Sequence, residues 1–341
     1  MEAIRNTLAE NFGKVGNIGT HPFSVDDVPD LSGKVAVVTG GSEGIGYGCT
    51  HTLLKHNIAK VYILSPSAEV VEGAKASIAK EIGQEAADKT HWKQCDIADW
   101  NQVRDVAEAI KKETDRLDIL INNAGRGIMT YQVTDLGVER HMALNHMGHT
   151  VLTSYLLPLL KKTASEKNTI VRISNQSSNL HESAPKDTKF ATLDEINTDL
   201  GPNTQYGRSK LAVLLHARYL NRKVTQGGHP NVLINATHPG IVSTKMSKRD
   251  IHEAYPLGGF AMSTGLEPFK KDQFEGALSM LYATTVTQES GQYICPPATP
   301  EPGSELSRDD ELADRLMELT RVTIVEKTRE HGKPIEDLEL Y

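Results

Sequence analysis

The feature that most constrains the fold of this chain is a short apolar run that leads directly into a glycine-rich turn. Residues 35–38 read VAVV and are followed by TGGSEGIG at 39–46, after which a helix is predicted to about residue 56. A fully apolar, β-branched run of this length is typical of a buried parallel strand. Glycines between such a strand and a helix N-terminus let the backbone approach a pyrophosphate, whose charge the helix end favours. A glycine-rich turn that binds no ligand is the alternative.

The alternation of strand and helix continues along the chain. Further strands are predicted at residues 60–64, 91–95, 118–121, 169–173, 231–236 and 292–294, and further helices at 68–82, 100–113, 137–162, 206–224, 274–283 and 308–331. This order predicts an α/β fold of the Rossmann type, a doubly wound parallel sheet flanked by helices. Ligands of such sheets bind at the carboxyl ends of the strands.

We predict a single dinucleotide-binding domain, residues 33–295, with an N-terminal extension at 1–32 and a C-terminal linker and helix at 296–341. The polar segment 180–204 is longer than most loops of a compact domain, which indicates a functional or inserted element. Residues 245–275 form a candidate substrate lid. The lid contains side chains that predict an apolar substrate pocket: His252, Tyr255, Phe260, Met262 and Phe269.

Composition narrows the functional classes. The net charge of −7 and the pI near 6.0 argue against a broad nucleic-acid footprint. Three widely spaced cysteines, Cys49, Cys95 and Cys295, indicate free thiols in a reducing compartment. No run of about 18 apolar residues predicts a membrane span. The N-terminus lacks the apolar core of a secretory signal, so we expect a cytoplasmic protein.

Two residues four apart, Tyr206 and Lys210, carry the clearest sign of chemistry. On a helix they lie one turn apart on one face, and the apolar residues 211–215 predict that this helix is buried. An ammonium within about 4–6 Å of a phenol favours the phenolate and lowers its pKa from about 10. A tyrosine tuned in this way can exchange a proton with an alcohol or a carbonyl near neutral pH. An ordinary helix with a half-buried Tyr is the alternative.

The predicted helix 137–162 places His141, Asn145 and His149 on one face. Such a face could suggest a metal site, but no carboxylate completes the set. We therefore interpret these residues as helix contacts near a cleft and predict no metal. Pro158, late in the pattern, predicts a kink or an end of the helix.

Five motifs together resemble those of the short-chain dehydrogenase/reductase family over roughly residues 33–295. TGGSEGIG (39–46) is similar to the family's cofactor turn, NNAG (122–125) to its sheet-stabilising motif and YGRSK (206–210) to its YxxxK. RISNQSS (172–178) resembles the strand that ends in the family's catalytic serine, and HPGIVST (238–244) resembles its PG motif at the nicotinamide. The segment LNHMGH and the long gap between the Ser and Tyr motifs are similar to the retinol-dehydrogenase and WW-domain-oxidoreductase branch, without a WW domain or a membrane anchor.

The resemblance implies a catalytic set of Asn145, Ser178, Tyr206 and Lys210. Tyr206 would be the general acid in carbonyl reduction and the general base in alcohol oxidation, and Lys210 would lower its pKa and bind the nicotinamide ribose. Ser178, chosen over the adjacent Ser177, would bond the substrate oxygen, and Asn145 would hold a water that links Lys210 to solvent.

The resemblance also implies a cofactor-binding set. Asp96 would contact the adenine, Asn123 the adenosine ribose and Thr244 the carboxamide. The full set, beside Tyr206 and Lys210, is Gly40, Ser42, Glu43, Gly44, Ile45, Gly46, Ser65, Asp96, Ile97, Asn123, Ala124, Gly125, Pro239, Gly240, Val242 and Thr244.

The choice between NAD(H) and NADP(H) rests on the end of the second strand and on the glycine-rich turn. Proteins that bind NAD usually have a carboxylate at the end of the second strand, where this chain has Ser65. Readers of the 2′-phosphate usually carry a basic residue at the positions of Pro66 or Glu43, and Glu43 would repel a phosphate if it faced the ribose. Because Ser65 and Ser67 can donate to a phosphate, and because the similar branch mostly uses NADP(H), we favour NADP(H) with Glu43 turned to solvent; NAD(H) is the alternative.

The sequence thus predicts an oxidoreductase that transfers a hydride between a nicotinamide cofactor and a ketone, aldehyde or secondary alcohol. A catalytically silent dinucleotide-binding sensor is the alternative function. We expect a small, apolar substrate, no nucleic-acid or membrane partner, and a homodimer or homotetramer formed through helices 137–162 and 206–224. The charged terminal helix could instead cap that surface.

Overall fold

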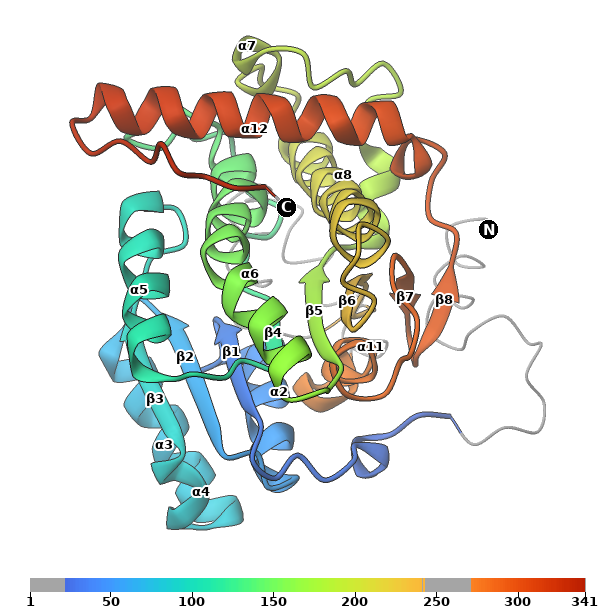
Figure 1. Cartoon of the computed structure of the whole chain (residues 1–341). Helices are drawn as coiled ribbons and strands as arrows, with labels where there is room; N and C mark the ends of the chain where they lie inside the picture. Colours follow the sequence, from blue (N-terminus) through green and yellow to red (C-terminus); the bar gives the residue numbers. More distant parts are fainter. Residues whose placement is uncertain (1–21, 241, 243–270, 341) are drawn as a thin grey trace, which may run out of the picture.

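The computed structural model describes residues 22–240, 242 and 271–340 and shows one sheet between two layers of helices (Figure 1). Along the sheet the strands follow the order β3-β2-β1-β4-β5-β6-β7-β8, and neighbours are parallel except for the antiparallel pair β7 and β8. The strands are β1 (Val35–Thr39), β2 (Lys60–Ser65), β3 (Thr90–Gln94), β4 (Ile119–Asn122), β5 (Val171–Gln176), β6 (Val232–Thr237), β7 (Tyr293–Cys295) and β8 (Thr299–Glu301). The order reverses between β1 and β4, so the predicted doubly wound Rossmann-type fold is confirmed.

The helices lie between successive strands of the chain, except for α12, which follows the last strand. They are α2 (Gly44–Lys55), α3 (Ala68–Ile82), α4 (Gln84–Asp88), α5 (Trp100–Glu113), α6 (His149–Glu166), α7 (Leu193–Ile196), α8 (Pro202–Leu220), α11 (Gln273–Thr285) and α12 (Asp310–Glu330). Shorter turns are the 3₁₀ segments η1 (Val25–Asp27), η3 (Asn179–Ser183) and η6 (Leu306–Arg308) and the π-helical segments η2 (Met142–Gly148) and η4 (Asn221–Thr225).

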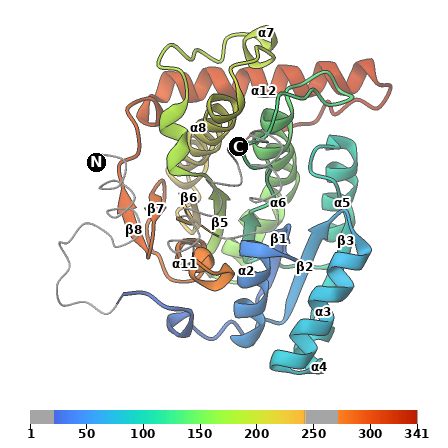
Figure 2. The ribbon, with the colours of Figure 1, turned by 180° about the vertical axis from the view of Figure 1, so that it is seen from behind.

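Alternate residues of the central strands face opposite layers, which gives the domain two apolar cores. Val37 and Leu120 belong to the core shared with α5, α6 and α8 (Figure 1). Val38 and Ile121 belong to the core shared with α2, α3 and α11. Figure 2 shows these three helices from behind. Each fully buried aliphatic side chain of this kind contributes roughly 1.5–3 kcal/mol of transfer free energy. The continuous apolar runs in the sequence thus reflect strands covered on both faces.

Two element boundaries differ from the sequence prediction near the site. Strand β5 extends to Gln176, because Ser174 and Asn175 remain in the sheet as buried residues instead of leaving it. The amide of Asn175 is satisfied there, since its oxygen accepts from Asn122 and its nitrogen donates to the carbonyl of Asn235. Helix α8 begins at Pro202 rather than at Tyr206, with the proline in the first turn, where its missing N–H costs nothing.

The helix expected at 137–162 begins near residue 140, passes through η2 and continues as α6 to Glu166. Pro158 lies inside α6 on its exposed side and does not end the helix, contrary to one of the two expectations for it. The π-helical segment includes Asn145, and it leaves no signature in the hydrophobic pattern.

The C-terminal segment packs against the domain. Residues expected to form a stiff linker instead contain β8, an edge strand in which Pro300 pairs opposite Ile294. A proline is tolerated there because an edge strand does not need every N–H for the ladder. Helix α12 lies across α8 (Figure 1). It therefore covers part of the helical surface predicted for self-association, as the alternative arrangement for the terminal helix predicts. The tail behind it buries Ile335 and Leu338 in the core.

Candidate active site

The glycine-rich turn joins the end of β1 to the start of α2. Gly40 has a φ of +63°, and a Cβ on Gly46 would lie 2.1 Å from the carbonyl oxygen of Gly40, so the turn has no room for a side chain there. Glu43 is the N-cap of α2 but makes no capping bond with its side chain, and it is exposed. Within the described residues, the first N–H groups of α2 therefore have no side-chain acceptor from the N-cap, and this arrangement fits a phosphate of a dinucleotide.

The NNAG segment is held against the end of β1 by Thr39. The backbone N–H groups of Asn123 and Ala124 both donate to the Thr39 hydroxyl at 2.9 Å, and the Asn123 side chain donates to the Thr39 carbonyl at 2.9 Å. The Asn122 amide donates to Thr153 at 3.0 Å, which ties β4 to α6. These bonds fix the two strand ends that flank the reversal of strand order.

Lys210 lies buried beneath the ring of Tyr206. Its Nζ is 5.5 Å from the centroid of that ring and donates to the carbonyl of Gln176 at 2.8 Å. Burial lowers the pKa of Lys210 to about 7. The side chain therefore holds a weakly bound proton next to a phenol, which is the arrangement that the Tyr–Lys spacing predicts.

Gly125 brings the end of β4 to the same point. A Cβ on Gly125 would lie 3.1 Å from Oδ1 of Asn145 and 3.5 Å from Nζ of Lys210. The three predicted site residues Gly125, Asn145 and Lys210 thus lie together, although they come from three separate segments of the chain.

Asn145 lies in η2 and its side chain is fully bonded. Its Oδ1 accepts from the N–H of Arg126 at 2.8 Å, and its Nδ2 donates to the hydroxyl of Ser209 at 2.9 Å. Its carbonyl oxygen accepts from Nδ1 of His149 at 3.2 Å, and Thr39 lies 2.9 Å from the other ring nitrogen. Asn145 therefore links α8 to the segment after β4, while its predicted role in holding a water stays a prediction.

The two adjacent serines differ in what their hydroxyls do. The Ser177 hydroxyl donates to the carbonyl of Lys210 at 2.8 Å, so its single proton is committed to the backbone of α8. Among the described residues, the Ser178 hydroxyl makes local contacts, accepting from the N–H of Leu180 and donating to the Asn179 side chain, both at 3.2 Å. Of the two, Ser178 can more easily turn its hydroxyl toward a ligand.

A close approach between α8 and η3 brings the serine segment to the tyrosine helix. A Cβ on Gly207 would lie 2.1 Å from the Ser183 hydroxyl and 2.5 Å from the carbonyl of Leu180. On the other side, buried Arg208 donates to the carbonyl of Glu195 at 2.7 Å and also to that of Ile196. The long segment between the Ser and Tyr motifs therefore folds onto α8 as an anchored element.

His141, predicted as a helix contact near a cleft, forms a buried pair with Glu139 beside Tyr206, and the sequence did not predict this partner. The ring of His141 lies edge-on to that of Tyr206, with centroids 6.1 Å apart. Its Nδ1 lies 2.7 Å from Glu139, whose side chain is completely buried, and its Nε2 lies 2.9 Å from the carbonyl of Gly127. Residues two apart in sequence do not in general have side chains in contact, so the sequence alone does not predict this pair. The turn that precedes η2 brings the side chains of Glu139 and His141 together.

The predicted adenosine end lies at the carboxyl ends of β2 and β3. Ser65 is buried, with its hydroxyl 3.4 Å from that of Ser42. Ser67 caps α3 by accepting from Val70. Asp96 is exposed, and its carboxylate accepts from the N–H of Ala98 at 2.9 Å. The side chain of the next residue, Ile97, is buried in the core.

The predicted nicotinamide end is described in part. Pro239 and Gly240 are half-buried and leave β6, and Gly240 has a φ of +80°. A Cβ on Gly276 of α11 would lie 2.6 Å from Val242 and 3.3 Å from Ile45. The structure therefore brings Val242 toward the glycine-rich turn. Thr244 and the predicted lid up to residue 270 lie outside the described residues.

Comparison with known proteins places the chain in a family. Residues 34–185 match the family model described as short chain dehydrogenase. The chain is 63% identical over 332 residues to "Putative oxidoreductase bli-4, mitochondrial" of Neurospora crassa, an alignment that covers 96% of this chain and 81% of that protein. The chain belongs to the short-chain dehydrogenase/reductase family.

Similarity to two further proteins supports the same family. The chain is 32% identical to "Short chain dehydrogenase/reductase dpchH" of Colletotrichum higginsianum, with 91% of this chain and 79% of that protein covered. The solved structure titled "Pseudomonas aeruginosa RhlG/NADP active-site complex" superposes with a TM-score of 0.58 at 26% identity and covers 82% of this chain and 98% of that one. The family membership and the oxidoreductase class are thus shown, and the finer resemblance to the retinol-dehydrogenase branch stays a prediction.

The expectation of a cytoplasmic protein is wrong by the same comparison, because the Neurospora relative is named mitochondrial. Mitochondrial transit segments are amphipathic and rich in Arg, so the lack of an apolar secretory core does not distinguish a mitochondrial from a cytoplasmic protein. Within residues 22–240, 242 and 271–340, no helix is long and apolar enough to cross a membrane.

Proposed function

We propose that this chain transfers a hydride between a nicotinamide cofactor and a ketone or aldehyde, or a secondary alcohol in the reverse direction, with Tyr206 as the proton donor or acceptor. The observation that carries the proposal is the buried Lys210, whose Nζ lies 5.5 Å from the centre of the Tyr206 ring. While Lys210 is protonated, its charge beside the ring favours the phenolate, which makes the exchange of a proton between the phenol and a substrate easier.

The nicotinamide cofactor, when bound, supplies the hydride. The residues of this chain bind it, orient it and move one proton. The start of α2 offers its N–H groups to the pyrophosphate, while Lys210 offers its ammonium to the ribose. Ser178 donates to the substrate oxygen and Tyr206 protonates it during reduction. In the oxidation direction Tyr206 accepts the proton instead.

For the cofactor we propose NADP(H), with NAD(H) as the alternative. The exposure of Glu43 supports a side chain turned to solvent, and no carboxylate stands at the end of β2, where Ser65 lies buried. Glu43→Arg should then tighten NADPH binding, because it replaces a repulsive charge with an attractive one, and should barely change NADH binding. Fluorescence titration of both cofactors tests this. Wild-type protein that binds NADH more tightly than NADPH would contradict it.

A catalytically silent sensor is the alternative function, and turnover separates the two. Purified chain with NADPH should oxidise the cofactor when cyclohexanone, acetophenone or benzaldehyde is added, and it should not do so in their absence. NADPH binding without turnover on any carbonyl of a broad panel would favour the sensor.

We also propose that the chain forms a homodimer or homotetramer, as closed symmetric assemblies are common. Because α12 lies across α8, that association would use a surface other than the covered part of α8. Light scattering at micromolar concentration measures the mass, and a monomer would contradict the proposal.

A further inference from the structure

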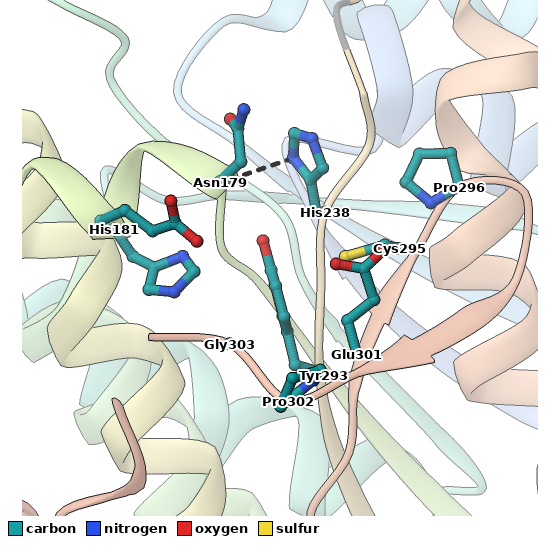
Figure 3. Close-up of a pocket in the computed structure, with 10 residues that line it drawn as sticks. Asn179, His181, His238, Tyr293, Cys295, Pro296, Glu301, Pro302 and Gly303 are labelled. Carbon is teal, nitrogen blue, oxygen red and sulfur yellow. Dashed lines mark hydrogen bonds between the residues drawn. The ribbon is translucent and has the colours of Figure 1, made fainter. Parts of the chain in front are cut away.

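A small cavity lies between η3 and the strand pair β7–β8, with Asn179 and His181 of η3 in its lining (Figure 3). Its volume is about 140 Å³. At about 30 Å³ for one water molecule, this is room for roughly four or five non-hydrogen atoms. The lining includes His181, His238, Tyr293, Glu182 and Glu301. The cavity thus offers several polar groups beside the apolar side chains of Pro296 and Pro302, unlike the apolar pocket that the lid sequence predicts.

Two buried polar groups in this lining have no hydrogen-bond partner within the described part of the chain. The Tyr293 side chain is 2% exposed, and its hydroxyl points toward the space between His181 and His238 (Figure 3). Burial and then the neighbouring Cys295 raise the pKa of Tyr293, so its hydroxyl keeps its proton. Nε2 of His238 is the second such group. Buried polar groups without partners are uncommon in native proteins and call for a ligand or water.

The protonation of the two histidines follows from their contacts. His181 Nδ1 lies 2.7 Å from the carbonyl of Ser178 and therefore donates, while its Nε2 accepts from the N–H of Ser304 at 3.0 Å. His238 Nδ1 accepts from the N–H of Asn179 at 3.4 Å, so its single ring proton is on Nε2. Burial lowers the pKa of both rings, to about 3 for His238, which keeps them uncharged.

The charges around the cavity select the kind of group that fits. Glu182 and Glu301 are exposed residues that line the cavity. After burial, the negative charges of both carboxylates add to the rise in the pKa of Tyr293. They disfavour an anion, whereas the unpaired N–H of His238 disfavours a cation. An uncharged hydroxyl matches both, because it accepts a hydrogen bond from one side and donates one to the other.

We propose that this cavity is a substrate subsite that binds an uncharged hydroxyl group on the substrate, away from the reacting carbon, through the Tyr293 hydroxyl and Nε2 of His238. The inference rests on the proposed carbonyl-reductase function and names its substrate class: hydroxylated ketones or aldehydes. Asn179, which lines the cavity, directly follows Ser178 in the chain, and Nδ1 of His181 donates to the backbone carbonyl of Ser178. The proposed subsite therefore lies beside the serine segment, where it would receive a substituent of the substrate.

The test uses matched ketones and matched variants. Cyclohexanone is compared with 2-, 3- and 4-hydroxycyclohexanone in the presence of NADPH. At least one hydroxylated ketone should show a higher kcat/KM than cyclohexanone, and Tyr293→Phe should lower that kcat/KM by roughly 3- to 10-fold, the effect of one uncharged hydrogen bond. Cyclohexanone itself should be unaffected. Tyr282→Phe, on the far end of α11, is the control and should change neither.

His238→Asn tests the contribution of the N–H at Nε2 of His238. The Asn oxygen can replace Nδ1 as the acceptor for the N–H of Asn179, but the variant has no donor at the position of Nε2. It should reduce the preference for the hydroxylated ketone as Tyr293→Phe does. A preference that survives both substitutions, or no preference for any hydroxylated ketone, would overturn the subsite.

Failure of the proposed function would be seen separately, as no reduction of any ketone, cyclohexanone included. In that case, calorimetric titration of the same protein with trans-1,4-cyclohexanediol and with cyclohexanol still measures whether the cavity binds a hydroxyl group. Tighter binding of the diol that weakens in Tyr293→Phe supports the subsite. Equal binding of the two alcohols means that the cavity holds only water and refutes it.

Discussion

Replacement of Lys210 by Met should abolish turnover and yet stabilise the fold near neutral pH. The side chain of Lys210 is buried, and burial lowers its pKa from 10.5 to about 7. The unfolded chain keeps the ordinary pKa. The folded state is therefore penalised for holding a charged ammonium, and a Met side chain of similar length removes that penalty.

The size of the effect follows from the pKa difference. A shift of one pKa unit corresponds to about 1.4 kcal/mol, so a fall from 10.5 to about 7 sets an upper limit of roughly 5 kcal/mol. The substitution also leaves the carbonyl of Gln176 without the bond from Nζ. That loss costs about 1–3 kcal/mol. The net stabilisation of Lys210→Met should then be roughly 2–4 kcal/mol below neutral pH.

The stability difference between the wild type and Lys210→Met should depend on pH, and the pKa values fix the direction of that change. Below the folded pKa of about 7 both states are protonated and the wild type carries the full penalty. Between that value and the ordinary pKa of 10.5 the unfolded state binds the extra proton, so wild-type stability rises with pH. The advantage of Lys210→Met should therefore shrink by about 2–3 kcal/mol between pH 6.5 and pH 9.

Urea unfolding followed by fluorescence at those two pH values measures the difference. Lys186→Met is the matched control, since Lys186 is exposed and its replacement should give a small difference that does not change with pH. A stability difference for Lys210→Met that is the same at both pH values would refute the account of a desolvated ammonium.

Two other predictions concern the segments that meet at Tyr206. Ser178→Ala should lose far more activity than Ser177→Ala, because the Ser177 hydroxyl is committed to the backbone of α8; the reverse ranking of kcat/KM would show that the register is wrong by one residue. Gly207→Ala should cost stability and activity together, since its Cβ would lie 2.1 Å from the Ser183 hydroxyl. Gly73→Ala in α3, where a Cβ meets nothing within 4 Å, should instead leave thermal stability equal or higher, and similar losses in both variants would contradict the packing argument.

The sequence was sufficient for the central strands and for the turn after β1. Their apolar runs are continuous because both faces of the sheet are covered, and that covering leaves a local pattern. Strand β8 leaves no such pattern. It is three residues long, includes Pro300 and is defined only by its pairing with β7. The π-helical segment around Asn145 likewise depends on packing against α8 rather than on local preference.

The candidate site divides in the same way. Tyr206 and Lys210 are four apart on one helix, so their proximity follows from sequence alone. The cavity beside η3 is different, because His181, His238 and Tyr293 come from three separate segments that meet only in the folded chain: η3, the residue after β6, and β7. No spacing in the chain relates them.

The kinetics of Tyr206→Phe test the central claim most directly. The Phe ring retains the packing against Lys210 and His141, while the proton donor is lost. General acid–base groups contribute on the order of 10²–10⁴-fold, so turnover with NADPH and a reducible ketone should fall by that factor. NADPH affinity, measured by fluorescence titration, should stay nearly unchanged. A variant that retains more than about a tenth of wild-type turnover would contradict the role of Tyr206.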